Sequence, residues 1–239
     1  MDELCLKNLK YYQVWSHRKL LLLLPTTLPS PIGDALSAIP PTPVQELSYL
    51  SRVLAEDVKN YHTWAYRQWV LTYYGDTHPD LWEHELLATD LLLKGDIRNN
   101  SAWHHRFFVS FASGAQRDVT QRELAFVKAK ISLAPNNLSA WNYLRGVLDK
   151  MGIRYAELRT FVEPYTTPPP SPRGQAEAGK REQGGRDTRG ETEVEVYDLD
   201  NPRPSLGADL PCALAIEFLA DLCEQEREND KASEVSLTR

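Results

Sequence analysis

The chain has 239 residues, 42% of them hydrophobic and 25% charged, so it can bury a sizeable core and its composition excludes no fold class. Its net charge of −6 and isoelectric point near 5.6 argue against a nucleic-acid partner, because phosphate binding requires a basic face. The longest apolar run, 20–25, is far shorter than the roughly 18 residues of a membrane span, so we expect a cytoplasmic protein without such a span.

One sequence pattern occurs four times along the chain. The pattern is Asn-x-x-x-Trp-x-x-Arg, with Tyr11 in place of the asparagine in the first copy and Leu144, followed by Arg145, in place of the arginine in the fourth, and the tryptophans lie 49, 39 and 38 residues apart. Periods of this size are typical of stacked structural repeats. The four copies are KYYQVWSHRKLLL (10–22), KNYHTWAYRQWVL (59–71), RNNSAWHHRFFVS (98–110) and NNLSAWNYLRGVL (136–148), aligned on Trp15, Trp64, Trp103 and Trp141.

The segments between the motifs have helical periodicity. Thr42-Pro43-Val44-Gln45 offers an N-cap, a proline at the first helical position and a capping-box partner. A second helix ends near Gly95, and Thr120 with Glu123 is expected to cap a third that stops at Pro135. Each repeat is therefore a helix, a short turn and a Trp-bearing helix. We predict an all-α fold, a right-handed superhelix (solenoid) of antiparallel helical hairpins.

The motif residues have an architectural interpretation. The asparagines (Asn60, Asn99 and Asn137) fall in the turn before the second helix, where the side chain can cap free N–H groups. Tryptophan and arginine then lie three apart on one helix face. We expect the tryptophan to fill the space between neighbouring hairpins and the arginine to stack on, or bond to, the previous turn.

Composition divides the chain into four parts. Residues 1–163 carry the repeats, with a proline-rich inter-helix loop at 25–43. Residues 164–208 are rich in Pro, Gly and charged residues and are predicted to be a disordered insertion. Residues 209–228 read as one more repeat helix docking on the array, and 229–239 as a flexible tail.

No metal site is expected in this chain. The three cysteines, Cys5, Cys212 and Cys223, have no metal-ligand spacing and are predicted to be core-facing thiols. His104 and His105 have no ligand-like companions, so we assign them a structural or surface role.

The four motifs resemble those of the α subunits of protein prenyltransferases, closest to the subunit shared by protein farnesyltransferase and type I protein geranylgeranyltransferase. KNYHTWAYRQWVL carries the resemblance most strongly, and the other three follow in the same order. The resemblance covers roughly 4–163, and ALAIEFLADL at 213–222 is similar to a later helix of the family.

The resemblance implies an enzyme that is active only as a heterodimer. In the family the α subunit wraps around a β subunit that carries the catalytic zinc, and magnesium is expected for the farnesyltransferase complex. The enzyme transfers a farnesyl or geranylgeranyl group from its diphosphate to the cysteine of a C-terminal CaaX sequence. Expected partners are therefore the β subunit, CaaX proteins and an isoprenoid diphosphate.

The resemblance also assigns site residues. Lys10 matches the lysine that reaches the isoprenoid diphosphate, where a cation stabilises the charge of the leaving group. Tyr12 matches a tyrosine near the same diphosphate, and both are placed in the catalytic group. Gln13 matches the glutamine that binds the C-terminal carboxylate of the peptide. Substrate contacts are also assigned to three residues of the next turn, Asn60, Tyr61 and His62.

The sequence departs from the family pattern at several points. Tyr11 replaces the family's asparagine beside Lys10, and Ser16 replaces a histidine. Family members carry longer sequences before the first motif and after the last helix. Two alternatives stay open: a non-catalytic helical-repeat scaffold, and the α subunit of Rab geranylgeranyltransferase, which shares the Trp-x-x-Arg element.

Overall fold

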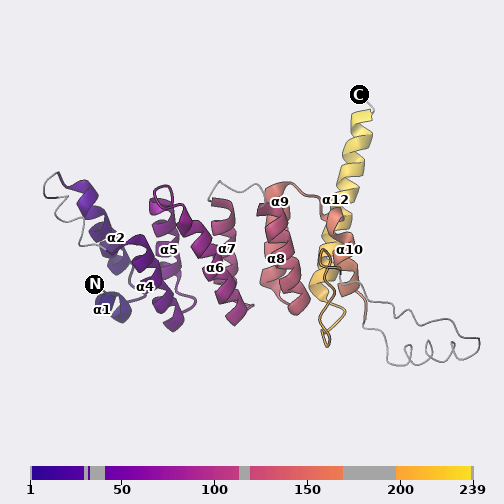
Figure 1. Ribbon diagram of the computed structural model, residues 1–239. Coiled ribbons are helices and arrows are strands. Elements are labelled where there is room, and N and C mark those ends of the chain that lie inside the picture. Colours follow the sequence, from indigo (N-terminus) through magenta and orange to yellow (C-terminus); the bar gives the residue numbers. More distant parts are fainter. Residues whose placement is uncertain (1, 30–31, 33–40, 113–118, 169–197, 238–239) are drawn as a thin grey trace, which may run out of the picture. The chain divides into compact units, whose positions relative to one another are not determined.

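The structure is a computed structural model that describes residues 2–29, 32, 41–112, 119–168 and 198–237 (Figure 1). Within these residues the regular secondary structure is helical, without a strand. The all-α architecture of antiparallel hairpins predicted from the sequence is confirmed. The chain forms two compact units, 1–116 and 117–239, and each is described by itself.

The first unit consists of three helical hairpins. Within each, two helices are joined by a four-residue turn, at 8–11, 57–60 and 96–99. The middle second helix packs against the second helices on both sides, so these three helices form one layer. The hairpins are α1 (Asp2–Lys7) with α2 (Tyr12–Thr27), α4 (Pro43–Glu56) with α5 (Tyr61–Tyr74), and α6 (Asp80–Gly95) with α7 (Asn100–Ala112).

The second unit contains a fourth hairpin and the elements that follow it. Its turn, 134–137, has the same length as the other three. An aromatic core joins Trp141 of the hairpin to Phe161 and Phe218, with ring centroids 6.5 and 5.8 Å from the indole. The elements are α8 (Val119–Leu133), α9 (Leu138–Met151), the 3₁₀ helix η1 (Tyr155–Leu158), α10 (Arg159–Val162), the 3₁₀ helix η2 (Glu163–Tyr165) and α12 (Ala213–Leu237).

Helix starts follow local capping chemistry. The capping box predicted at Thr42 is confirmed: its Oγ1 accepts from the Gln45 amide at 3.3 Å, and the Gln45 side chain accepts from the Thr42 amide at 2.9 Å. The cap predicted at Thr120 is wrong, because α8 already contains Val119. Its supposed partner Glu123 is instead buried and accepts a hydrogen bond from Tyr143.

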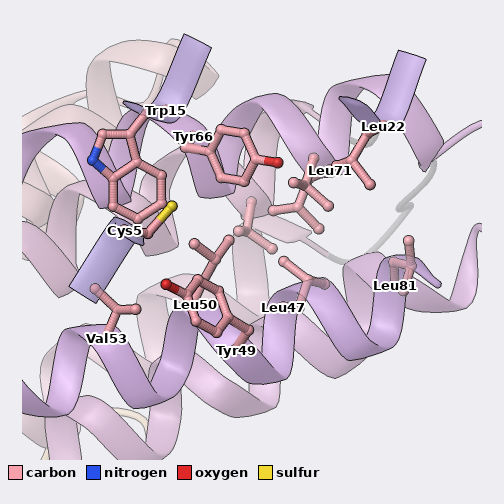
Figure 2. Close-up of a cluster of buried hydrophobic side chains, with 12 residues drawn as sticks. Cys5, Trp15, Leu22, Leu47, Tyr49, Leu50, Val53, Tyr66, Leu71 and Leu81 are labelled. Carbon is pink, nitrogen blue, oxygen red and sulfur yellow. The ribbon is translucent and has the colours of Figure 1, made fainter. Parts of the chain in front are cut away.

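The core of the first unit lies between its two helix layers. Figure 2 shows Trp15 of α2, Leu50 of α4 and Tyr66 of α5 converging on one cluster. The Trp15 and Tyr66 rings are 5.4 Å apart, and Trp64 lies 4.9 Å from the ring of His105 in the next hairpin. The prediction that the motif tryptophans fill the space between neighbouring hairpins is therefore confirmed for Trp15 and Trp64.

Two of the motif arginines bind a buried glutamate of the following hairpin, whereas Arg106 donates to Thr89 and Asp90 of its own hairpin. Arg18 donates to both oxygens of Glu46, and Arg67 to both oxygens of Glu85. Both glutamates are almost fully buried, with exposed fractions of 1% and 2%. The interpretation that the arginines bond to the previous turn is wrong for these two, because the strongest acceptor lies on the next hairpin.

The same glutamates also bind the second helix of their own hairpin, through the residue two positions after the tryptophan. Tyr66 donates to Glu46 at 2.8 Å, and His105 Nε2 lies 2.6 Å from Glu85 Oε1. In the second unit Tyr143 donates to Glu123 at 2.7 Å. A buried carboxylate is tolerated because its oxygens have these partners.

The loop predicted between the first two hairpins begins later than the sequence interpretation placed it. The loop assigned to 25–43 is wrong at its start, because α2 continues through Pro25 to Thr27. A proline in the last helical turn removes one backbone hydrogen bond, and the preceding leucine run favours the helix. Residues 30–31 and 33–40 of this loop lie outside the described residues.

The insertion assigned to 164–208 is ordered at both ends, so this interpretation is wrong for 164–168 and 198–208. Tyr165 is fully buried, and its hydroxyl donates to Pro202 O at 2.6 Å. The Ser205 amide donates to Ser132 O at 3.0 Å and Lys128 Nζ to Asp200 O at 2.8 Å, which fasten the returning segment to α8. Residues 169–197 lie outside the described residues.

The last helix is longer than the sequence suggested. It runs from Ala213 to Leu237, so the end placed at residue 228 and the flexible tail placed after it are wrong in their boundaries. Ion pairs from Arg145 to Asp221 at 2.9 Å and from Arg159 to Glu226 at 3.0 Å join α12 to the preceding elements. Cys5 and Cys212 are buried as predicted, whereas Cys223 is exposed.

We predict that Glu85→Ala destabilises the chain by about 3–5 kcal/mol, because Arg67 then stays buried without its carboxylate. Glu83→Ala, on the exposed face of the same helix, should cost less than about 1 kcal/mol. Urea unfolding followed by circular dichroism measures both. Equal unfolding midpoints for the two variants would contradict a stabilising role of the buried pair.

A second prediction concerns pH. Burial lowers the pKa of His105 below its ordinary 6.5, although its hydrogen bond to Glu85 acts in the opposite direction. The Nδ1 atom of His105 has no hydrogen-bond partner among the described residues, so protonation would bury an unsatisfied donor. The unfolded chain therefore binds the proton more readily, and stability should fall as the pH decreases below about 6.5.

His105→Tyr supplies the residue used at the matching positions 66 and 143, and should flatten this pH dependence between pH 7 and 5. Below that range Glu85 also contributes. Burial alone would raise its pKa, but His105 and Arg67 outweigh burial and lower it from 4.5 to about 2. Unfolding curves at each pH measure the effect, with exposed His84→Gln as the control. A pH profile identical in His105→Tyr and the parent chain would disprove the assignment.

Candidate functional site

The four turns between paired helices share one construction. In each, the amide of the last turn residue donates to the carbonyl three residues earlier at 3.0–3.1 Å, and the motif indole donates to the carbonyl six residues before it at 2.7–2.9 Å. Asn60, Asn99 and Asn137 also cap their helices as predicted, each accepting a hydrogen bond from an amide of the first helical turn. The four turns therefore share one backbone conformation, held by the same hydrogen bonds.

The first two turns are joined directly. The Leu9 carbonyl accepts from Trp15 Nε1 at 2.9 Å and from Asn60 Nδ2 at 3.2 Å. Trp15 belongs to the hairpin of the first turn, whereas Asn60 closes the second. Residues that follow Leu9 and residues that follow Asn60 therefore lie at one edge of the unit.

The residues assigned to catalysis and peptide binding stand at this edge. Lys10, Tyr12 and Gln13 are all exposed, at the start of α2. Tyr61 is 76% exposed at the start of α5, and the half-buried His62 contacts it edge to face with ring centroids 5.6 Å apart. The structure thus brings the two groups of assigned residues onto adjacent turns, with five of the six side chains at least partly open to solvent.

Asn60 differs from the other five. Its side chain is 4% exposed, and its amide is already bonded: Oδ1 accepts from Thr63 N at 3.0 Å, and Nδ2 donates to Leu9 O and to Asp57 Oδ2. Little of this amide is left for a substrate. The substrate contact expected for Asn60 from the family resemblance is therefore not supported by its surroundings.

The edge carries positive charge. Lys10, Lys59 and Arg98 occupy the same motif position, five residues before the tryptophan, and all three are exposed. Within the part of the chain that the structure describes, no carboxylate pairs with the Lys10 ammonium. A cation without an internal counterion can bind an external anion without first breaking an ion pair.

The sequence reasoning missed the buried glutamates. Glu46, Glu85 and Glu123 each lie 18 residues before a motif tryptophan, and each binds the residue two positions after that tryptophan. This fixed interval was available in the sequence as a signal. The structural role predicted for His105 is confirmed by its bond to Glu85, whereas His104 is exposed.

Two features that other functions would require are absent from the described parts of the chain. No cluster of three or more His, Cys, Asp or Glu side chains there could hold a metal ion. Of the helices within the described ranges, none combines the length and the apolarity needed to cross a membrane.

The chain matches a family model along most of its first two thirds. The model is described as the protein prenyltransferase alpha subunit repeat, and it matches residues 1–24, 43–74, 82–112 and 120–151. Each matched segment ends within one of the second helices described above, and each begins within or beside the first helix of the same hairpin.

Known relatives include subunits of two types. The geranylgeranyl transferase type-2 subunit alpha of Saccharomyces cerevisiae is 28% identical over 153 residues, which are 63% of this chain and 44% of that protein. The protein farnesyltransferase/geranylgeranyltransferase type-1 subunit alpha of Dictyostelium discoideum is 44% identical over 69 residues, 28% of this chain and 21% of that protein. The matches thus span less than half of either relative.

A solved structure is similar over nearly the whole chain. A chain of Candida albicans protein geranylgeranyltransferase-I complexed with GGPP superposes with a TM-score of 0.66 at 27% identity, covering 96% of this chain and 61% of that one. With four matched repeats, relatives of both types and a shared fold, the chain belongs to the family of protein prenyltransferase alpha subunits.

Proposed function

We propose that the chain is the α subunit of a heterodimeric CaaX protein prenyltransferase, which transfers a farnesyl or geranylgeranyl group from its diphosphate to the cysteine of a C-terminal CaaX motif. The observation that carries the proposal is the edge of the first unit, where an exposed lysine without an internal counterion stands beside an exposed tyrosine of the next turn. Family membership supplies the reaction class.

The chemistry of transfer fits these side chains. The cysteine sulfur forms a bond to C1 of the isoprenoid while the bond from C1 to the diphosphate oxygen breaks, and the thiol proton is lost. Negative charge grows on the departing diphosphate. In this proposal the Lys10 ammonium and the phenols of Tyr12 and Tyr61 stabilise that charge, and an interaction that strengthens in the transition state raises the rate.

The remaining residues bind the substrates. Gln13 carries an uncharged amide on the same exposed turn of α2 and donates to the C-terminal carboxylate of the peptide. His62, packed on Tyr61, supplies a further hydrogen bond to the diphosphate or to the partner subunit. Asn60 is not included, because its amide is buried and bonded within the protein.

Zinc and magnesium are proposed to belong to the complex. The described residues of this chain offer no zinc-binding cluster, and the β subunit is proposed to hold the ion. Bound zinc would favour the thiolate of the peptide cysteine, and magnesium would accompany the diphosphate in a farnesyltransferase complex.

The layer of second helices is the proposed docking face for the β subunit. Further along α5 from Tyr61, Trp69 and Tyr73 form a stacked pair with ring centroids 5.3 Å apart, and Lys19 of α2 lies 4.5 Å above the Trp69 ring. Leu20 of α2 is also exposed. Aromatic and apolar side chains of this kind are enriched at protein interfaces.

A second candidate is the α subunit of a type II (Rab) geranylgeranyltransferase. It is favoured by the length of the match to the Saccharomyces cerevisiae relative, 153 residues, against 69 for the type-1 relative from Dictyostelium discoideum. The two candidates share the lysine and the turn geometry and differ in the β subunit and in the protein substrate.

Co-expression with the β subunits of farnesyltransferase and of both geranylgeranyltransferases tests the proposal. Each purified complex is supplied with labelled isoprenoid diphosphate and with either a CaaX peptide or a Rab protein with its escort protein. We expect a stable complex and transfer to the CaaX peptide. Transfer only to Rab would select the second candidate. Failure to bind any of the three β subunits would favour a non-catalytic scaffold.

In an active complex we predict that Lys10→Ala lowers kcat by a factor on the order of 10², with a much smaller change in KM for the peptide, because the lysine acts mainly on the transition state. Lys150→Ala, an exposed lysine in the last turn of α9, is the control and should leave both constants unchanged. Steady-state kinetics with a CaaX peptide measures the effect. Equal losses in the two variants would remove Lys10 from the mechanism.

A further inference from the structure

The peptide group between Leu9 and Lys10 is held by two side chains from different hairpins. Its carbonyl accepts from Trp15 Nε1 at 2.9 Å and from Asn60 Nδ2 at 3.2 Å. A peptide group is planar, so fixing the carbonyl also fixes the Lys10 nitrogen and the direction in which its Cα leaves the group. The two bonds therefore determine where the Lys10 side chain starts.

The first turn lacks the support that other turns have. At the N-cap of α2, Tyr11 makes no side-chain capping bond, whereas the asparagines before α5 and α9 cap their own helices. The backbone bond from the Tyr11 amide to Asn8 O, at 3.0 Å, remains. The hydrogen bond from Asn60 supplies from the neighbouring hairpin a restraint that the first turn does not provide for itself.

Asn60 is well placed to impose this restraint, because it is itself fixed. It is almost fully buried, and its Oδ1 accepts from the Thr63 amide at 3.0 Å while its Nδ2 also donates to Asp57 Oδ2 at 3.3 Å. A group that is already ordered loses little conformational entropy when it holds another group.

We propose that Asn60 is a positioning residue that sets the place of Lys10 by binding the Leu9 carbonyl across the hairpin boundary. The proposal rests on the proposed function, in which Lys10 acts on the isoprenoid diphosphate. It gives Asn60 two separate tasks: Oδ1 caps α5, and Nδ2 holds the turn that carries the lysine. An amide side chain suits both tasks because its acceptor and its donor are separate atoms, whereas an ionised aspartate has no donor and serine has only one, shorter hydroxyl group.

Two variants separate these tasks. Asn60→Ser keeps a good N-cap but loses the donor to Leu9. Asn60→Asp keeps the acceptor and replaces the donor with a carboxylate oxygen. Asn99→Ser is the matched control, because Asn99 caps the helix of the next turn, accepting from the amides of Ser101 and Ala102.

Hydrogen exchange in the full chain tests the restraint without reference to activity. We expect amides of the segment 9–14 to exchange about fivefold faster in Asn60→Ser and Asn60→Asp, consistent with the loss of one hydrogen bond, and to be unchanged in Asn99→Ser. Unchanged exchange in both Asn60 variants, or equal acceleration in the control, would overturn the proposal. Because hydrogen exchange is measured on the chain itself, this test remains informative even if no β subunit yields activity and the proposed function fails.

Kinetics of the active complex tests whether Asn60 acts through Lys10. We expect Asn60→Ser to lower kcat by about fivefold with little change in the peptide KM, and to have almost no further effect when Lys10→Ala is already present. A residue that acts through another gives such a non-additive result, because removing the second residue removes the effect of the first. The same fivefold loss in both backgrounds would show that Asn60 acts independently of the lysine and would refute the positioning role.

Discussion

The buried pair of an arginine and a glutamate from successive hairpins is the interaction on which the first unit depends. Glu46 and Glu85 are each bound by the second helix of their own hairpin and by an arginine of the hairpin before it. A single hairpin would therefore bury a carboxylate without its cation, which costs several kcal/mol. Stacking with the correct neighbour removes that cost, so the pair couples each repeat to the next.

The coupling between hairpins also affects the candidate functional site. It fixes how far one hairpin lies from the next, so the turns of a unit repeat at a constant interval. Four motif positions build the repeat: the asparagine, the tryptophan, the residue two positions after the tryptophan, and the arginine. Lys10, Tyr12, Gln13 and Tyr61, which occupy positions between and before them, are exposed, and the neighbouring His62 is half-buried. Each copy of the motif thus combines a repeated backbone geometry with side chains that can take part in a reaction.

Much of the fold could be predicted from the sequence because its strongest signals are local. The period of the tryptophans and the capping residues Thr42, Asn60 and Asn137 depend on neighbours within a few positions. The buried glutamates could not be recognised in the same way. Glu46, in isolation, looks like an ordinary residue of a helix surface, and its partners lie 20 residues ahead and 28 behind.

The same reasoning explains the errors in the second unit and at the site. Composition marked 164–208 as one disordered tract, but the buried Tyr165 joins its two ends, and hydrogen bonds to α8 also hold the returning segment. Exposure of Cys223 depends on which side of α12 faces the aromatic core, which is a tertiary property. For the site, resemblance could propose residues, but only the structure could separate the exposed Tyr61 from the buried Asn60.

Tyr165 has a consequence for how this protein can change over evolutionary time. Its hydroxyl binds Pro202 O, and its carbonyl accepts from the Cys212 amide at 2.8 Å, immediately before α12. Tyr165 thus lies where the chain leaves the core, and it is hydrogen-bonded to the segment that returns. The position of α12 then depends on this fastening and not on the length of sequence between them. Since the entropy of closing a loop grows only with the logarithm of its length, insertions and deletions there can accumulate at little cost to the fold.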